Sequence, residues 1–189
     1  MLTVILTGGG SRRMGRDKAM LPWQGSTMLQ HLIDKYSAAL GDVAVSVNER
    51  GRFPFTGAAE LCDRYPNLGP LNGIVSAFAE TDADLVFLTG TDLPWGDPEL
   101  VLRLRELMGG ADACVLRRGR KGMEPLFALY GRACGESARR CLETGKQSFF
   151  DMLEDVNVRF VSPEELPGFD LEHILMNVNT AEEYEKAKR

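Results

Sequence analysis

The sequence contains little cysteine, and the cysteines it has form no recognisable pattern. Its four cysteines, Cys62, Cys114, Cys134 and Cys141, include no C-x-x-C pair, the spacing typical of zinc and redox sites. A chain of 189 residues can bury a core large enough to be stable without disulfides. We therefore expect neither a zinc centre nor a disulfide framework, and the absence of a disulfide pattern favours the reducing cytoplasm.

Long hydrophobic runs are also absent. The apolar start MLTVIL meets glycine at position 8, which is too early for a signal-peptide core, and no stretch approaches the roughly 18 apolar residues of a membrane span. The formal net charge of −5 argues against general attraction to nucleic acid or anionic membranes. We therefore expect neither a nucleic acid nor a membrane as partner.

Strand and helix patterns alternate through the first two-thirds of the chain. Runs of apolar and β-branched residues predict buried strands at 2–7, 42–48 and 84–92. Helical spacing and capping signals predict helices at 27–40, 71–80 and 98–108 and a last helix after Thr180-x-x-Glu183. Weaker patterns predict strands at 61–64, 111–117, 124–131 and 158–162, and helices at 132–143 and 147–154. These patterns indicate one α/β domain over residues 1–189, Rossmann-like, with three layers and a mainly parallel central sheet.

The stretch ILTGGGSRRMGRDK at residues 5–18 is the most informative. A strand that ends in glycines exposes backbone N–H groups, and the nearby Arg12, Arg13 and Lys18 add positive charge, so a polyphosphate is the favoured ligand. The stretch is not a P-loop, because Arg16 and Asp17 follow Gly15. It is not a dinucleotide fingerprint either, because Arg13 stands where the third glycine is required. By themselves the glycines could equally form a tight turn.

These residues resemble the signature loop of nucleotidyltransferases that join an NTP to a small phosphorylated acceptor, and most of all that of the molybdenum cofactor guanylyltransferases. Further matching motifs follow in order: Asn48 after the second strand, Asp63 before G-P-L-x-G at 69–73, Asp92 in T-D-L-P, E-P-L-F-A-L-Y at 124–130 and N-V-N-T at 177–180. The resemblance covers almost the whole chain. It implies an enzyme that transfers GMP from GTP to the terminal phosphate of molybdopterin and releases pyrophosphate.

The resemblance also implies roles for individual residues. It makes Lys18, Arg12, Arg13 and Asp92 catalytic, and it assigns a Mg²⁺ ion to Asp92. The implied nucleotide-binding residues are Leu6, Thr7, Gly8, Gly9, Lys18, Asn48, Asp63, Gly69 and Asp92. Asn177 and Asn179 are implied on the acceptor side, although both could instead only shape the turn before the last helix.

The chemistry agrees with these roles. An acceptor phosphate is ionised at neutral pH, so nucleotidyl transfer requires positive charge more than a general base. The two histidines, His31 and His173, are therefore expected to be structural. Magnesium needs only one or two carboxylates besides substrate phosphates, so Asp92 is sufficient. Guanine presents N–H donors, and Asp63 or the loop at 68–71 could supply the acceptors.

Three alternatives remain open from the sequence. Two are sister enzymes, a molybdopterin cytidylyltransferase and a guanylyltransferase of a cobamide precursor. The third is a nucleotide-binding module without turnover, against which Lys18 and Asp92 argue together, because binding alone does not demand a metal carboxylate. The turn RRGRKG at 117–122 could be a solvated loop or could attract the pterin phosphate. The resemblance also implies transient contacts with proteins of cofactor biosynthesis or molybdoenzyme maturation.

Overall fold

The computed structural model describes residues 1–8, 17–65, 68–118 and 122–188. In these residues the main sheet has seven strands in the order β5-β4-β1-β6-β8-β7-β9. The strands are β1 (Leu2–Leu6), β4 (Val43–Val47), β5 (Ala59–Cys62), β6 (Leu85–Gly90), β7 (Ala113–Arg118), β8 (Gly122–Gly131) and β9 (Val158–Val161). Strand β8 runs antiparallel to both of its neighbours, and the other pairs are parallel. The predicted mainly parallel sheet is therefore confirmed.

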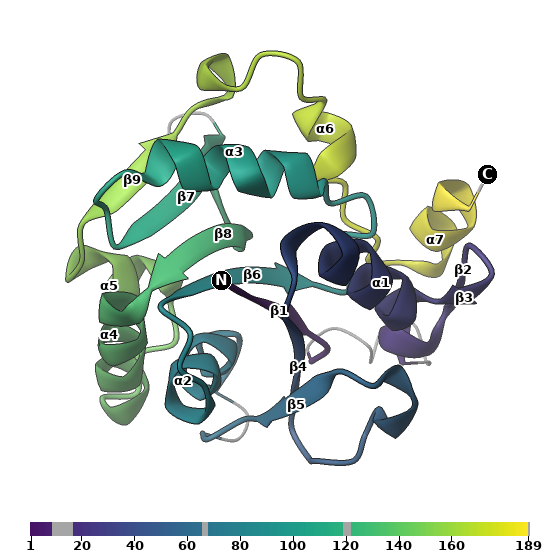
Figure 1. Ribbon diagram of the computed structural model, residues 1–189, viewed down its shortest axis with the longest axis horizontal. Coiled ribbons are helices and arrows are strands. Elements are labelled where there is room, and N and C mark those ends of the chain that lie inside the picture. The colour runs from purple at the N-terminus through teal and green to yellow at the C-terminus, as the bar shows by residue number, and fades with distance from the viewer. Residues whose placement is uncertain (9–16, 66–67, 119–121, 189) are drawn as a thin grey trace.

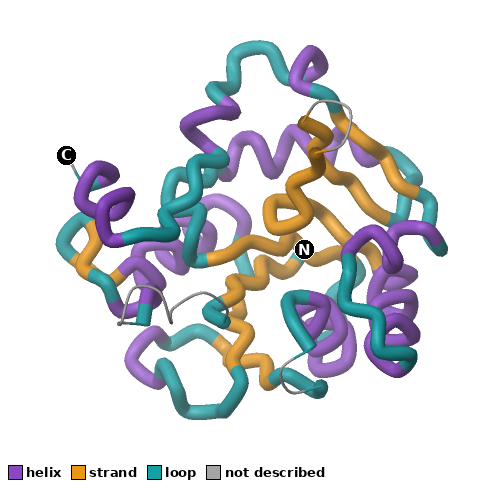
Figure 2. Tube along the Cα trace, turned by 180° about the vertical axis from the view of Figure 1, so that it is seen from behind, coloured by secondary structure: helices purple, strands orange, loops and turns teal. Residues whose placement is uncertain are grey.

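Helices cover both faces of this sheet (Figures 1 and 2). One face packs on α1 (Met28–Leu40), α3 (Pro98–Met108) and α6 (Leu171–Ile174), and the other on α2 (Leu71–Glu80), α4 (Arg132–Glu143) and α5 (Phe149–Glu154). The last helix, α7 (Ala181–Ala187), lies apart from both layers, beside the short strands β2 (Pro22–Trp23) and β3 (Ser26–Thr27). The expected three-layer architecture is confirmed.

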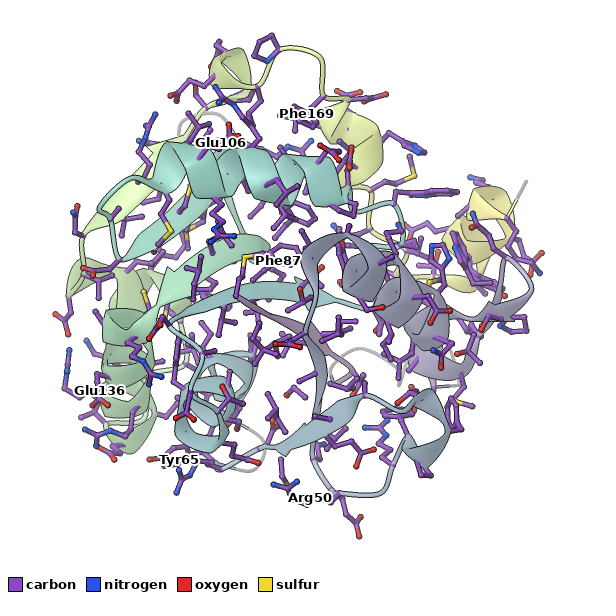
Figure 3. All side chains as sticks on the ribbon, viewed as in Figure 1. Arg50, Tyr65, Phe87, Glu106, Glu136 and Phe169 are labelled. Carbon is purple, nitrogen blue, oxygen red and sulfur yellow. The ribbon has the colours of Figure 1, made fainter. Side chains whose placement is uncertain are left out.

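The central strands read as continuous apolar runs because both of their faces are buried. All five residues of β1 are buried, with Val4 in the cluster under α2 and α4 and Ile5 in the cluster under α1 and α3. Phe87 of β6, labelled in Figure 3, contacts the rings of Tyr36 and Phe127 edge-on at centroid distances of 5.4 and 5.0 Å. This burial on both faces is typical of parallel strands.

Several elements differ from the sequence-based prediction. The third strand, β5, spans Ala59–Cys62 instead of 61–64, because its register with β4 pairs Ala59 with Ala44. Helix α5 begins at Phe149 instead of 147, because Ser148 caps it by accepting a hydrogen bond from the Phe150 N–H. The β2–β3 hairpin, α6 and the 3-10 helices Lys18–Met20, Pro54–Thr56 and Pro163–Glu165 were not predicted. These elements span only two to four residues, too few for a hydrophobic period to show.

A third apolar cluster joins the hairpin to the C-terminal helix. It contains Leu21, Trp23, Met28, Val178 and Tyr184, and the Tyr184 hydroxyl donates a hydrogen bond to the Pro22 carbonyl. Residues far apart in the sequence are thereby held together beside the ends of the central strands (Figure 1). Among the described residues, no helix has the length and apolar character that a membrane crossing requires.

Helix α4 packs on α2 at a glycine, Gly135. A Cβ added to Gly135 would lie 2.6 Å from Phe78 Cδ2 and 3.1 Å from Phe78 Cβ. We expect Gly135→Ala to lower the free energy of unfolding by about 1–2 kcal/mol, because the overpacking exceeds the gain in helix propensity. Chemical denaturation measures the change. The control is Gly110→Ala, whose added Cβ meets no atom within 4 Å; equal stability of both variants would contradict the packing argument.

Candidate functional site

The candidate site lies where four adjacent parallel strands end. Thr7 and Gly8 follow β1, Asn48 follows β4, Asp63 follows β5, and Asp92 lies two residues after β6. The chain leaves β1 toward β4 on one side and later enters β6 on the other side of β1. A sheet of this kind has its ligand crevice at such a switch point, beyond the carboxyl ends of the strands.

At the end of β1, the side chains of Leu6 and Thr7 are engaged within the protein, so these residues and Gly8 offer a ligand their backbone. The Leu6 side chain is buried in the core, and its carbonyl accepts a hydrogen bond from the Thr91 N–H at 3.2 Å. The Thr7 hydroxyl donates to the Ser46 carbonyl at 2.7 Å and so ties β1 to β4. Gly8 lies against Asn48, whose Oδ1 is 3.7 Å from the position of an added Cβ. The predicted site residues Gly9, Arg12 and Arg13 lie outside the described residues.

Asp63 is held by β4. Its N–H donates to the Val47 carbonyl at 2.9 Å, and its Oδ1 accepts a hydrogen bond from the Ser46 hydroxyl at 3.0 Å. Partial burial raises the pKa of Asp63, and the Ser46 hydrogen bond opposes that rise. Ser46 therefore organises both Thr7 and Asp63. Ser46 was not predicted as a site residue, although a serine within the apolar strand VAVSV was a usable signal.

The loop between β5 and α2 is fixed by Asn72, which the sequence analysis also missed. The Asn72 side chain is buried; its Nδ2 donates to the Tyr65 carbonyl at 2.6 Å, and its Oδ1 accepts from the Tyr65 N–H at 3.0 Å. Asn72 lies in the first turn of α2, where an asparagine side chain often binds nearby backbone groups, and this position could have indicated its role. The predicted nucleotide-binding residue Gly69 belongs to this loop and has a φ of +81°, a conformation that favours glycine.

Lys18 is buried at the edge of the site. Asp17 caps the 3-10 helix that carries it, accepting a hydrogen bond from the Ala19 N–H at 3.1 Å and pairing with Arg52 at 2.6 Å. The Lys18 ammonium donates a hydrogen bond to Asn179 Oδ1 at 3.3 Å. This contact joins the N-terminal and C-terminal parts of the chain. Burial lowers the pKa of Lys18, and the negative charges of Asp92 and Glu183 counteract that effect.

Asp92 is held in place from both sides. Its carbonyl accepts a hydrogen bond from the Val178 N–H at 2.9 Å. The loop after it is anchored by the Lys35 ammonium, which donates to the Pro94 and Gly96 carbonyls at 2.6 and 3.2 Å. Among the described residues, the half-exposed Asp92 carboxylate takes part in no hydrogen bond or ion pair. Its oxygens are thus available to a ligand.

The two asparagines of N-V-N-T occupy different positions. Asn179 contacts Lys18, and its N–H donates to the Glu183 carboxylate at 2.6 Å. Glu183 also accepts from the Thr180 N–H at 3.0 Å in the predicted capping box. Asn177 is exposed and lines a groove on the other side of this segment. The structure therefore brings Lys18, Asp92 and Asn179 together and places Asn177 at a neighbouring surface.

The histidines and the basic turn stand outside this arrangement. The rings of His31 and His173 pack against Trp23 and Trp95, at centroid distances of 6.3 and 4.8 Å. Residues 119–121 of the basic turn lie outside the described part of the chain, and Arg118 beside them pairs with Glu124 at 3.2 Å.

Comparison with known proteins identifies the family. The model of the MobA-like NTP transferase domain matches residues 3–157. A probable molybdenum cofactor guanylyltransferase of Bacillus cereus is 33% identical and covers 98% of this chain and 94% of its own length; one from Carboxydothermus hydrogenoformans has the same identity and coverage. The crystal structure of molybdopterin-guanine dinucleotide biosynthesis protein A from Archaeoglobus fulgidus superposes with a TM-score of 0.85 at 24% identity, over 100% of this chain and 97% of that one. The chain therefore belongs to the MobA-like NTP transferase domain family.

Proposed function

We propose that this chain transfers GMP from GTP to the terminal phosphate of molybdopterin, or of its molybdenum-bearing form. The products are the guanine dinucleotide cofactor and pyrophosphate. The observation that carries the proposal is the full-length similarity to relatives named molybdenum cofactor guanylyltransferase. The convergence of Lys18, Asp92 and Asn179 at the sheet edge supports it.

The nucleotide is assigned to the side of the site formed by β1, β4 and β5. The backbone N–H groups after β1 and the Lys18 ammonium face the triphosphate in this proposal. An ammonium group has three N–H donors, and the contact with Asn179 uses one and orients the others. Asp63 Oδ1 is engaged by Ser46, which leaves Oδ2 to accept a hydrogen bond from guanine N1–H or N2–H.

Asp92 fits a magnesium ion. Magnesium takes hard oxygen ligands, keeps several waters and shares substrate phosphates. Among the described residues, the Asp92 carboxylate takes part in no hydrogen bond or ion pair, so its oxygens suit an ion held by one protein carboxylate and the substrate. Such an ion, when bound, neutralises phosphate charge. Asp92 is the residue that would hold it.

In the transfer step, an oxygen of the acceptor phosphate forms a bond to the α-phosphorus of GTP while the bond to the bridging oxygen breaks. The departing pyrophosphate takes the electron pair of that bond. No proton needs to be removed from the acceptor, because its phosphate is ionised at neutral pH. This chain contributes positioning and positive charge: Lys18 balances phosphate charge, and the hydrogen bonds of Val178 and Lys35 fix the loop that carries Asp92.

The experiment that tests the function measures pyrophosphate release by the purified protein with magnesium, molybdopterin and either GTP, CTP or ATP. We expect release with GTP alone. Release with CTP would identify a cytidylyltransferase. GTP binding without any release would favour the non-catalytic module, and release with GTP only when a cobamide precursor replaces molybdopterin would identify the other sister enzyme.

Removing Lys18 or the Asp92 carboxylate is expected to abolish most of the activity. We expect Lys18→Ala and Asp92→Ala each to lower kcat/KM by about 10²–10³-fold, because the first loses a positive charge that balances the phosphates and the second loses the carboxylate that would hold the magnesium ion. Steady-state pyrophosphate release measures the loss. The control is Lys146→Ala, which removes a surface ion pair with Asp151 and is expected to leave the rate unchanged. Full activity of either site variant would contradict its assigned role.

Glu183 is expected to act through Asn179. We expect Glu183→Gln to lower kcat/KM for GTP by about five- to tenfold, because a charge-assisted hydrogen bond to the Asn179 N–H is weakened. Glu182→Gln, next to it and exposed, is the matched control. Thr180→Ala removes the other half of the capping box and tests helix capping alone. If Thr180→Ala reduces activity as much as Glu183→Gln, the effect belongs to the cap and not to Asn179.

Recognition of GTP is expected to weaken at acidic pH. Protonated Asp63 cannot accept from guanine as a carboxylate does, and burial raises its pKa above the usual value of 3.8, so KM for GTP should rise as the pH falls through that raised value. Ser46→Ala removes the hydrogen bond that favours the ionised form. In Ser46→Ala, the rise in KM for GTP should therefore begin at a higher pH than in the wild-type protein. An unchanged pH profile of KM in this variant would argue against Asp63 as the base acceptor.

A further inference from the structure

The loop between β4 and β5 contacts the segment that carries Lys18, and the proposed mechanism assigns no role to this contact. The loop spans residues 48–58 (Figure 1), and we refer to it as the β4–β5 loop. Its Arg52 guanidinium donates a hydrogen bond from Nη2 to Asp17 Oδ2 at 2.6 Å, across 35 positions of the sequence. The exposed fraction of the side chain is 33% for Arg52 and 27% for Asp17. The ion pair is therefore partly shielded from solvent and salt.

The neighbours of Arg52 restrain it. The Glu60 carboxylate of β5 accepts hydrogen bonds from the Phe53 N–H, at 2.5 Å, and from the Gly51 N–H, which lie on either side of Arg52 in the sequence. Gly51 has a φ of +81°, a conformation that favours glycine and lets nearby N–H groups point at one anion. The guanidinium also lies 5.0 Å from the centroid of the buried Phe53 ring. Both the backbone and the side chain of Arg52 are thus fixed.

Asp17 connects Arg52 to Lys18. While its Oδ2 pairs with Arg52, its Oδ1 accepts a hydrogen bond from the Ala19 N–H at 3.1 Å. The 3-10 helix that begins at Lys18 has only three residues, so its position depends on contacts with other elements. On the other side of Lys18, Ala19 is buried in the cluster under α1 and α3. Lys18 therefore lies between two residues that the rest of the protein holds in place.

The ion pair joins two segments of the proposed nucleotide site. Lys18 directly follows Asp17, and the β4–β5 loop begins at Asn48, whose Oδ1 lies 3.7 Å from the position of a Cβ added to Gly8. A fixed contact between these segments sets the position of the lysine relative to the ends of β1 and β4. An ammonium group balances phosphate charge well only from a defined position.

The charges favour this role for Arg52 over direct contact with phosphate. Asp17 neutralises Arg52 at 2.6 Å, so a triphosphate that approached this guanidinium would also meet the Asp17 carboxylate and be repelled by it. Lys18 differs, because its ammonium hydrogen-bonds to the uncharged amide of Asn179. Within the described part of the chain, Lys18 forms no ion pair, so its charge is available to a ligand.

We propose that Arg52 is a positioning residue for GTP binding: through its ion pair with Asp17, it sets where the Lys18 ammonium meets the triphosphate. This inference rests on the proposed function, because it names a residue that supports GTP binding in that reaction. The sequence N-E-R-G-R-F at 48–53 contains two arginines, and only the fold shows that the second one faces Asp17.

Direct binding of GTP tests the inference without turnover. Isothermal titration calorimetry with GTP and magnesium is performed on the wild-type protein, Arg52→Ala, Asp17→Asn and the double variant. Asp17→Asn keeps a side-chain oxygen that can accept from the Ala19 N–H and removes the charge. We expect each single variant to weaken GTP binding about fivefold, the scale of a partly exposed ion pair. The double variant should bind no more weakly than either single one, whereas independent effects would give about 25-fold.

Arg50→Ala is the matched control. Arg50, labelled in Figure 3, belongs to the same loop, but its guanidinium pairs with Glu80 of α2. We expect its GTP affinity to be unchanged; a loss equal to that of Arg52→Ala would assign the effect to the loop in general and overturn the inference. Arg52→Lys keeps the charge, and the contact is a single hydrogen bond, so we expect affinity within about twofold of the wild type. Thermal denaturation checks that each variant is folded.

Kinetics of GMP transfer separate this inference from the proposed function. We expect Arg52→Ala to raise KM for GTP about fivefold and to leave KM for molybdopterin unchanged. Weaker GTP binding in Arg52→Ala together with unchanged or tighter binding in Asp17→Asn would overturn the inference, because Arg52 would then bind the phosphates directly. Unchanged GTP binding in both variants would also overturn it and leave the proposed function intact. The expected pattern of GTP binding in a protein without GMP transfer would support the inference and reject the proposed reaction.

Discussion

The parallel pairing of β5, β4, β1 and β6 is the constraint on which the rest of the structure depends. Because these strands run in the same direction with matched registers, their carboxyl ends lie at one edge of the sheet. Four loops from distant parts of the sequence therefore meet there. The surrounding structure holds those loops in position. Ser46 connects the loop after β1 to the loop after β5, and Asn72 shapes the loop after β5. Lys35 anchors the loop after β6.

Charge at this edge is arranged around Lys18. Removing an ammonium group from water is unfavourable by several kcal/mol unless it is compensated, and the lowered pKa of Lys18 reflects that burial. Asp92, Glu183 and the amide oxygen of Asn179 supply the compensation. A triphosphate brings far more negative charge than these groups. The site thus keeps a buried cation stable without ligand and leaves it able to attract one.

The sequence predicted the residues whose position follows from strand ends and local motifs. The glycine loop and Asp92 could be placed at one edge because each lies at the end of a recognisable strand, whereas Asp63 fell inside the strand predicted at 61–64 and follows β5 only in the structure. The roles assigned to Asn48, Asp63 and Asp92 remain predictions. Gly9, Arg12 and Arg13 lie outside the described residues, so their placement also remains a prediction. The contact between Lys18 and Asn179 spans 161 positions, and no local pattern encodes such a pair.

Residues that support the site from a second element were not predictable for the same reason. From the sequence, Glu183 is recognisable only as part of a capping box. Its hydrogen bond from the Asn179 N–H depends on the conformation of the segment before α7, which the sequence does not indicate. Trp95 reads as a loop residue, and its contacts with Trp23 and His173 join the loop after Asp92 to the hairpin and to α6. The β2–β3 hairpin that carries Trp23 has strands of two residues, which are too short for periodicity to indicate.

The segment from Met176 to Glu183 connects the last helix to the residues of the candidate site. On one side Asn179 contacts Lys18 and the Val178 N–H holds the Asp92 carbonyl; on the other side Met176, Asn177 and Val178 line the groove. Transfer between two anions requires their phosphates to be held in line against mutual repulsion. Asn179 and Val178 belong to this segment, so its position sets where the Lys18 ammonium and the Asp92 backbone lie. Because α7 is capped by Thr180 and packed on the hairpin through Tyr184, the stability of this C-terminal helix determines how precisely Lys18 and Asp92 are held relative to each other.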